Sequence, residues 1–196
     1  NQCNDEPMRR LAVICGALSA ALPLLANAGN VVFTPGALGQ VNVPVKSFLE
    51  IRFEDVVRQA YDFSCGSAAV ATLLTYHYDQ PRTEEAVFTA MYENGDQEKI
   101  RSKGFSLLDM KLFLESLGYK ADGFRIPVDK LITVDIAAIA LINVRGYSHF
   151  VVVKAADSER VLVSDPAVGN RVLHRGQFEE MWNGIFLLIH SDMSVA

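Results

Sequence analysis

A loop gives way to a helix within residues 59–77, which read QAYDFSCGSAAVATLLTYH. The alanines and leucines after Ser64 favour a helix that ends near His77. Cys65 stands at the start of this helix, where the positive end of the helix dipole favours a thiolate. Gly66 has no side chain, so another backbone or a substrate has room to approach. The stretch therefore predicts either a reactive cysteine or a small buried core residue.

The order of helical and strand-like segments predicts an α+β domain. Further helices are expected to begin at Thr83 and at Ser106, where Ser106 and Asp109 have the spacing of a capping box and Gly118 ends the segment. The second half changes to short apolar or β-branched runs, at residues 137–144, 149–155, 160–164, 171–173 and 185–190, with one short helix at 177–182. Helices first and strands afterwards indicate helices packed on an antiparallel sheet.

The N-terminal residues have the organisation of an export signal. Residues 8–10 are Met-Arg-Arg, residues 11–25 are an uncharged apolar run, and residues 26–28, Ala-Asn-Ala, form a cleavage pattern. The run is shorter than the roughly 20 residues that span a bilayer, although a retained membrane anchor is the alternative. We expect residues 1–7 to precede the start, 8–28 to be a signal peptide, 29–47 an extended segment and 48–196 the main domain, located in the periplasm.

Composition excludes several classes of function. The chain has 196 residues, half of them hydrophobic, and a net charge of −5. Disorder is therefore not expected, and neither nucleic acid nor anionic lipid is an expected partner, because both attract basic surfaces. Of three cysteines only Cys65 remains after signal cleavage, and no histidines have metal-ligand spacing. We expect no disulfide, no metal and no cofactor.

His149 is the best candidate for a base that activates Cys65. It opens the apolar run at residues 150–153 after a turn, and the following strand ends at Asp165. Folding these strands about residues 157–158 places His149 opposite Asp165 within one position, where paired Cβ atoms are about 4.5–5.5 Å apart. A carboxylate there holds the imidazole tautomer and stabilises the imidazolium. Taken singly, the two residues also fit a strand-end histidine and an Asp-Pro turn.

Gln59 and the remaining histidines complete the candidates. Gln59 lies six residues before Cys65, so its amide and the Cys65 backbone N–H are candidate donors to an oxyanion. Alone, such a glutamine is a surface residue. His77 is about 18 Å along the helix from Cys65, which is too far for a base. His174 and His190 are expected to be surface or capping residues.

These motifs, in this order, resemble the bacteriocin-processing, double-glycine peptidase family of the papain-like cysteine peptidases. The resemblance rests on Gln59-(x5)-Cys65-Gly66, on residues 148–152, SHFVV, and on Asp165-Pro166, with a further likeness over residues 104–118. It implies a papain-like fold in which N-terminal helices pack on a C-terminal antiparallel sheet. It also implies a triad of Cys65, His149 and Asp165, with Gln59 as the oxyanion residue, and cleavage of leader peptides after a small, often double-glycine, pair.

Two features differ from many members of this family. Many members carry an acidic residue directly before the cysteine, where this chain has Ser64. Many members are also fused to a transporter. As an exported, standalone form, and in residues 63–66 and 104–110, the chain is most similar to peptidases encoded with functional-amyloid secretion systems of pseudomonads. The resemblance implies a peptide or protein substrate, and outer-membrane secretion machinery or amyloid subunits as partners.

Two other functions fit the same residues. A transglutaminase-like acyl transferase uses the same Cys-His-Asp order but passes the acyl group to an amine, which changes the mass of the product. A papain-like domain without catalytic power could bind a leader peptide or chaperone an exported subunit. The rate at which Cys65 reacts with iodoacetamide separates this binding function from catalysis.

Overall fold

The computed structural model describes residues 30–33 and 41–190. The chain divides into two compact units, residues 1–45 and 46–196, and the expected signal peptide lies outside the described residues. In the first unit β1 (Asn30–Phe33) and β2 (Val41–Pro44) pair as an antiparallel hairpin. None of the helices in the described part of the chain combines the length and the hydropathy that a bilayer span requires.

The second unit begins with helices whose caps follow the sequence. They are α1 (Phe48–Arg52), α2 (Cys65–His77), α3 (Glu84–Asn94), α4 (Gln97–Lys103) and α5 (Leu107–Ser116). Ser106 and Asp109 form the expected capping box at α5, and the Thr83 hydroxyl accepts from the first turn of α3. Gly118, beyond the end of α5, has a φ of 88°, a conformation that favours glycine.

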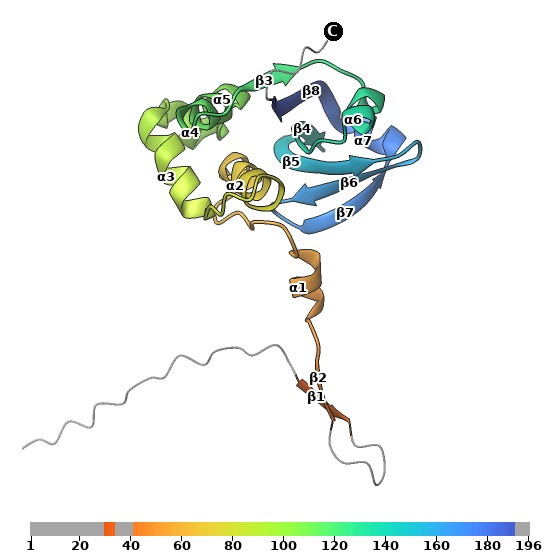
Figure 1. The fold of residues 1–196 in the computed structure, drawn as a ribbon. Coiled ribbons are helices and arrows are strands. Elements are labelled where there is room, and N and C mark those ends of the chain that lie inside the picture. Colours follow the sequence, from red (N-terminus) through yellow and green to blue (C-terminus); the bar gives the residue numbers. More distant parts are fainter. Residues whose placement is uncertain (1–29, 34–40, 191–196) are drawn as a thin grey trace, which may run out of the picture. The chain divides into compact units, whose positions relative to one another are not determined.

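The C-terminal half is a six-stranded antiparallel sheet. Its strands are β3 (Ala121–Phe124), β4 (Ala138–Val144), β5 (Tyr147–Ala156), β6 (Arg160–Asp165), β7 (Gly169–His174) and β8 (Trp182–Ile189). The spatial order is β3-β8-β4-β5-β6-β7, so β8 returns to pair between β3 and β4 (Figure 1). Two short helices, α6 (Val128–Val134) and α7 (Arg175–Met181), interrupt the series.

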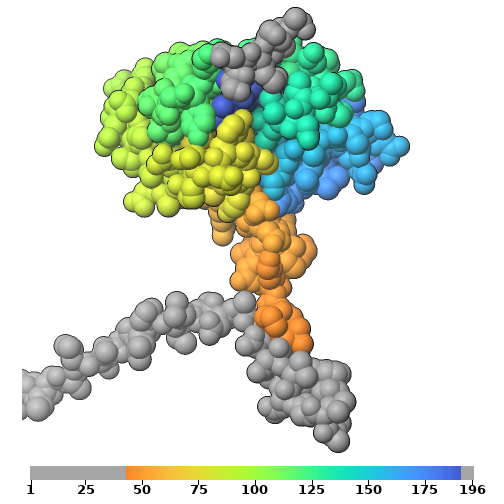
Figure 2. Space-filling model, viewed as in Figure 1, coloured from red at the N-terminus to blue at the C-terminus, as the bar shows by residue number. Residues whose placement is uncertain are grey.

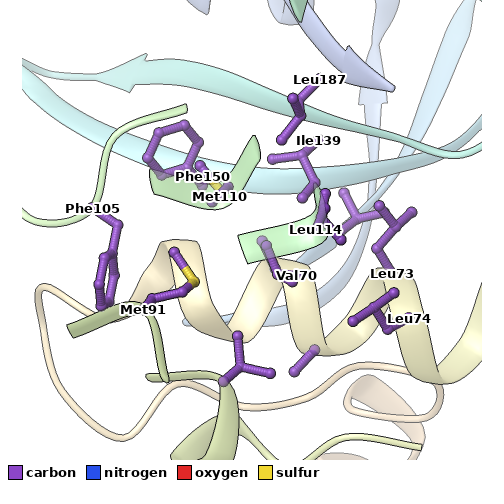
Figure 3. Close-up of a cluster of buried hydrophobic side chains, with 14 of the residues drawn as sticks. Val70, Leu73, Leu74, Met91, Phe105, Met110, Leu114, Ile139, Phe150 and Leu187 are labelled. Atoms are coloured by element: carbon purple, nitrogen blue, oxygen red, sulfur yellow. The ribbon is translucent and has the colours of Figure 1, made fainter. Parts of the chain in front are cut away.

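Apolar side chains on both faces of the sheet form the core. Val70 of α2 lies in one cluster with Ile139 and Leu187 of the sheet (Figure 3), and all three are at most 1% exposed. The next residue of β4, Ala140, belongs to a second cluster with Phe178 of α7, because side chains alternate along a strand. Helices α2 to α5, yellow to green, lie beside the teal and blue strand region in Figure 2. The α+β class and the antiparallel sheet are confirmed.

Four elements have no counterpart in the expectations from sequence, namely α1, α4, β3 and α6. Helix α4 is polar apart from Ile100, its one buried residue, so its sequence shows no apolar period. Helix α6, VDKLITV, is rich in β-branched residues, which are typical of strands. Burial of its Val128 and Leu131 in the second cluster overrides that local preference.

Candidate active site

Cys65 is the first residue of α2, at the end of a tightly held loop. Ser64, directly before it, is fully buried; its hydroxyl donates to the Tyr61 carbonyl at 3.0 Å and accepts from the Tyr61 N–H at 3.1 Å. Ser64 therefore closes the loop by hydrogen bonding and brings no charge next to the thiol. Cys65 itself is 6% exposed, and its backbone N–H, the first of the helix, has no acceptor within the helix.

His149 and Asp165 meet, although not in the register that the sequence predicts. A bulge in β5, after Val153, shifts the pairing of β5 with β6 by one residue. Continued toward Asp165, this register places it opposite Val151, two residues along from His149, so the expectation of pairing within one position is wrong. Residues two apart on a strand point to the same side. The contact therefore still forms, with His149 Nε2 2.8 Å from Asp165 Oδ1.

Asp165 is buried and receives several donors. The N–H groups of Ala167 and Val168 donate to Oδ1 at 2.9 and 3.3 Å, and Arg171 Nη1 lies 3.6 Å from Oδ2. Burial raises the pKa of the Asp165 carboxyl, but the hydrogen bond and charge of His149, together with the Ala167 and Val168 N–H groups, outweigh burial, and the pKa lies below its usual value. The carboxylate is therefore ionised at neutral pH and holds the imidazole in one orientation.

The imidazole of His149 is set between Asp165 and Cys65. Burial lowers its pKa, but the hydrogen bond to Asp165, the nearby Cys65 thiol and the charges of both groups raise the pKa from 6.5 to about 9. Because Asp165 contacts Nε2 of His149, Nδ1 is the ring nitrogen that can interact with Cys65. This nitrogen is buried, and no protein atom forms a well-aligned hydrogen bond with it. Catalytic hydrogen bonds are often long or poorly aligned until substrate binds.

Gln59 reaches this region from the loop before α2. Its backbone N–H donates to the carbonyl of Pro166 at 3.0 Å, which ties the loop to the turn that follows Asp165. Its side-chain Nε2 donates to the Tyr61 carbonyl at 3.1 Å, within the loop that ends at Cys65. An amide nitrogen carries two N–H groups, so one of them remains available to another acceptor.

Cys65 borders a cleft of about 480 Å³. Its walls include the aromatic side chains Phe105 and Phe150, and α4 contributes two exposed lysines, Lys99 and Lys103. An apolar wall excludes water and strengthens the electrostatic interactions of the groups beside it. The cleft therefore has room for a peptide segment next to the thiol.

Tyr147 borders the same cleft, and sequence reasoning did not single it out. Its hydroxyl donates to the carbonyl oxygen of Asp62 at 2.5 Å. The sequence pattern suggests a turn over residues 146–148, whereas the structure begins β5 at Tyr147. The available signal was its position two residues before His149, which places both side chains on the same side of one strand.

The other histidines lie outside this cluster. His77 is the last residue of α2 and His174 the last of β7, while His190 Nε2 lies 3.0 Å from Asp122 Oδ2 on the edge strand β3. In the described ranges, no group of three or more His, Cys, Asp or Glu side chains is arranged to hold a metal ion.

The fold and these contacts together define a class of protein. A cysteine at the N-terminus of the central helix, with a histidine that a carboxylate orients on the adjoining sheet, is the arrangement of papain-like cysteine peptidases. Comparison with known families agrees, because the model of the "Peptidase C39 family" matches residues 54–194. The chain belongs to the peptidase C39 family and is a cysteine peptidase.

Curated relatives include two proteins named "Probable functional amyloid protease FapD". The one from Pseudomonas fluorescens is 42% identical over 182 residues, which are 93% of this chain and 80% of the relative. The one from Pseudomonas aeruginosa is 44% identical over 155 residues, 79% of this chain and 68% of the relative. The family resemblance that the motifs predict is confirmed.

Solved structures support the same fold. The peptidase domain of Streptococcus ComA, a bi-functional ABC transporter, superposes with a TM-score of 0.58 at 17% identity, covering 68% of this chain and 96% of that domain. A double glycine motif protease from an AMS/PCAT transporter, in complex with the leader peptide, superposes with a TM-score of 0.56 at 24% identity, covering 68% and 89%. The papain-like fold of the main unit is thereby confirmed.

Proposed function

We propose that Cys65, His149 and Asp165 are the catalytic triad of this peptidase. The observation that carries the proposal is the 2.8 Å contact between His149 Nε2 and Asp165 Oδ1, because it leaves Nδ1 for the thiol at the start of α2. Three side chains from a helix and two strands thereby supply a nucleophile, a base and a group that orients the base. These proposed roles are the ones that the sequence predicts for the three residues.

The reaction follows from these roles. His149 Nδ1 takes the proton of Cys65, and the thiolate attacks the scissile carbonyl carbon. The tetrahedral intermediate collapses as the imidazolium protonates the leaving amine, and a thioester to Cys65 remains. A water molecule, deprotonated by His149, attacks the thioester and releases the carboxylic acid, which restores the thiol. Asp165 stays ionised throughout and stabilises the imidazolium.

Gln59 is proposed as one donor to the oxyanion. The Cys65 N–H has no acceptor within the helix, and Gln59 retains one N–H after its bond to the Tyr61 carbonyl. Two such donors stabilise the negative oxygen of the tetrahedral intermediate, each by about 3 kcal/mol. The bond to Tyr61 also holds the Gln59 amide near the nucleophile loop before substrate arrives.

The proposed substrate is a leader or exported protein of an amyloid secretion system, cut after a small, Gly-Gly-like pair. The support is the name of the two curated relatives at 42% and 44% identity, together with the motifs around Cys65 and His149. We further propose that residues 8–28 export the enzyme to the periplasm, on the basis of their basic, apolar and small-residue order. The substrate would then be met outside the cytoplasm.

Mass spectrometry of exported proteins tests this proposal. We expect at least one exported protein to lose an N-terminal segment after a Gly-Gly-like pair in cells with the wild-type enzyme, but not in cells with Cys65→Ala. The N-terminal segment that is cut off should end in a free carboxylate. An amine adduct at that end would indicate acyl transfer instead of hydrolysis. Identical exported proteins in both strains would contradict the proposed cleavage. An enzyme that remains in the cytoplasm when the cells are fractionated would contradict the proposed export.

A further inference from the structure

Tyr147 lies at the corner between β4 and β5. The two-residue turn consists of Arg145 and Gly146, with φ of 53° and 89°, the positive values of a tight hairpin turn. It places Tyr147 opposite Val144 as the first residue of β5. Tyr147 and His149 point to the same side of the strand, and their ring centroids are 6.2 Å apart. The tyrosine therefore stands next to the proposed base.

The Tyr147 side chain joins two walls of the cleft. Its hydroxyl donates to the carbonyl of Asp62, 85 positions away, and both residues border the cleft. Asp62 belongs to the loop that ends at Cys65, so one side chain links the strand of the base to the loop of the nucleophile. Burial, and then the charges of Cys65 and Asp62, raise the pKa of Tyr147. The hydroxyl therefore keeps the proton that it donates.

The segment that carries Phe105 packs closely against the start of α2. A Cβ at Gly66 would lie 3.0 Å from Phe105 Cβ, and a Cβ at Gly104, where φ is 76°, would lie 3.2 Å from the carbonyl oxygen of Phe63. The start of α2 and the segment before α5 are thus in close contact that only glycines permit. The cleft beside Cys65 is bounded by this close contact and by Tyr147, which is hydrogen-bonded to Asp62, and Cys65 is 6% exposed.

We propose that Tyr147, held by its bond to Asp62, is a specificity-determining residue that excludes bulky side chains next to the scissile bond. Glycine, alanine or serine leaves the phenol ring in place, whereas a branched or aromatic side chain must break the hydrogen bond and displace the ring. The inference rests on the proposed function, since it assigns the selection of small residues at the same site to one side chain.

Alkylation of Cys65 tests the proposal without a known substrate. The rates for iodoacetamide, a small reagent, and for a pyrene-bearing maleimide are measured in wild type, Tyr147→Phe and Tyr147→Ala. Tyr147→Phe removes only the hydroxyl, and Tyr147→Ala removes the ring. We expect the ratio of maleimide to iodoacetamide rates to rise about threefold in the first variant and tenfold or more in the second. Tyr76→Phe, at an exposed tyrosine of α2, should leave it unchanged.

The outcomes separate this inference from the proposed function. An unchanged rate ratio in both Tyr147 variants overturns the specificity role, even if Cys65 is highly reactive. A Cys65 that reacts with iodoacetamide no faster than free cysteine instead contradicts the proposed triad, while the rate ratio still reports on Tyr147. If thermal unfolding shows that Tyr147→Ala does not fold, the rate ratio of Tyr147→Phe decides.

Peptides with Gly or Leu before the scissile bond give the second readout. The kcat/KM for the Leu peptide relative to the Gly peptide should rise tenfold or more in Tyr147→Ala.

Discussion

Replacing Cys65 by alanine is expected to abolish cleavage of a peptide substrate, with kcat/KM lower by about 10⁴-fold or more. The thiol forms the covalent intermediate, and no other described residue of the cleft is a cysteine. His149→Ala should lower the rate by a similar factor, because it removes the group that takes and returns the proton. Peptide cleavage followed by chromatography and mass spectrometry measures both.

His77→Ala is the matched control for the histidine. His77 is the last residue of α2 and is exposed, so its loss should leave kcat/KM within about twofold of wild type. Thermal unfolding of each variant checks that the fold is retained. Cleavage by Cys65→Ala at the wild-type rate would show that Cys65 is not the nucleophile.

Asp165→Asn is expected to lower kcat by about 10²–10⁴-fold with little change in KM. The amide oxygen can still accept from the Ala167 and Val168 N–H groups, so the turn should persist. The amide carries no charge, however, and the contribution of Asp165 that raises the His149 pKa to about 9 is lost. The alkaline limb of the pH profile of kcat/KM should therefore move to lower pH. A variant that only loosened the fold would not shift this limb.

An exposed aspartate supplies the control for this substitution. Asp135 follows α6 with a φ of 50°, a conformation that asparagine also tolerates. Asp135→Asn should change neither kcat nor the pH profile. Wild-type kcat in Asp165→Asn would show that His149 needs no carboxylate partner.

Much of the site could be predicted because it depends on local signals. The composition after Ser64 predicts α2, and the change from loop to helix places Cys65 at its first position. The proximity of His149 and Asp165 follows from two adjacent strands joined by a short reversal. These features need only periodicity and chain connectivity, which a single sequence contains.

The remaining features depend on tertiary contacts. The bulge after Val153 carries no glycine or proline signal, so the register of Asp165 relative to His149 was wrong by one position. Contact survived because the shift left the two side chains on the same side of their strands. Tyr147 was overlooked because its partner, the Asp62 carbonyl, is a backbone group far away in the chain. No side-chain pattern reveals such an acceptor.

The rate of Cys65 alkylation, measured with and without His149, tests the central claim most directly. His149 has a pKa of about 9, above its usual 6.5, so the ring stays positive below pH 9 and favours the neighbouring thiolate. At pH 7 Cys65 should therefore react with iodoacetamide at least tenfold faster than free cysteine, and His149→Ala should remove most of this advantage. A wild-type rate no higher than that of free cysteine, unaltered by His149→Ala, would contradict the proposed activation of Cys65 by His149.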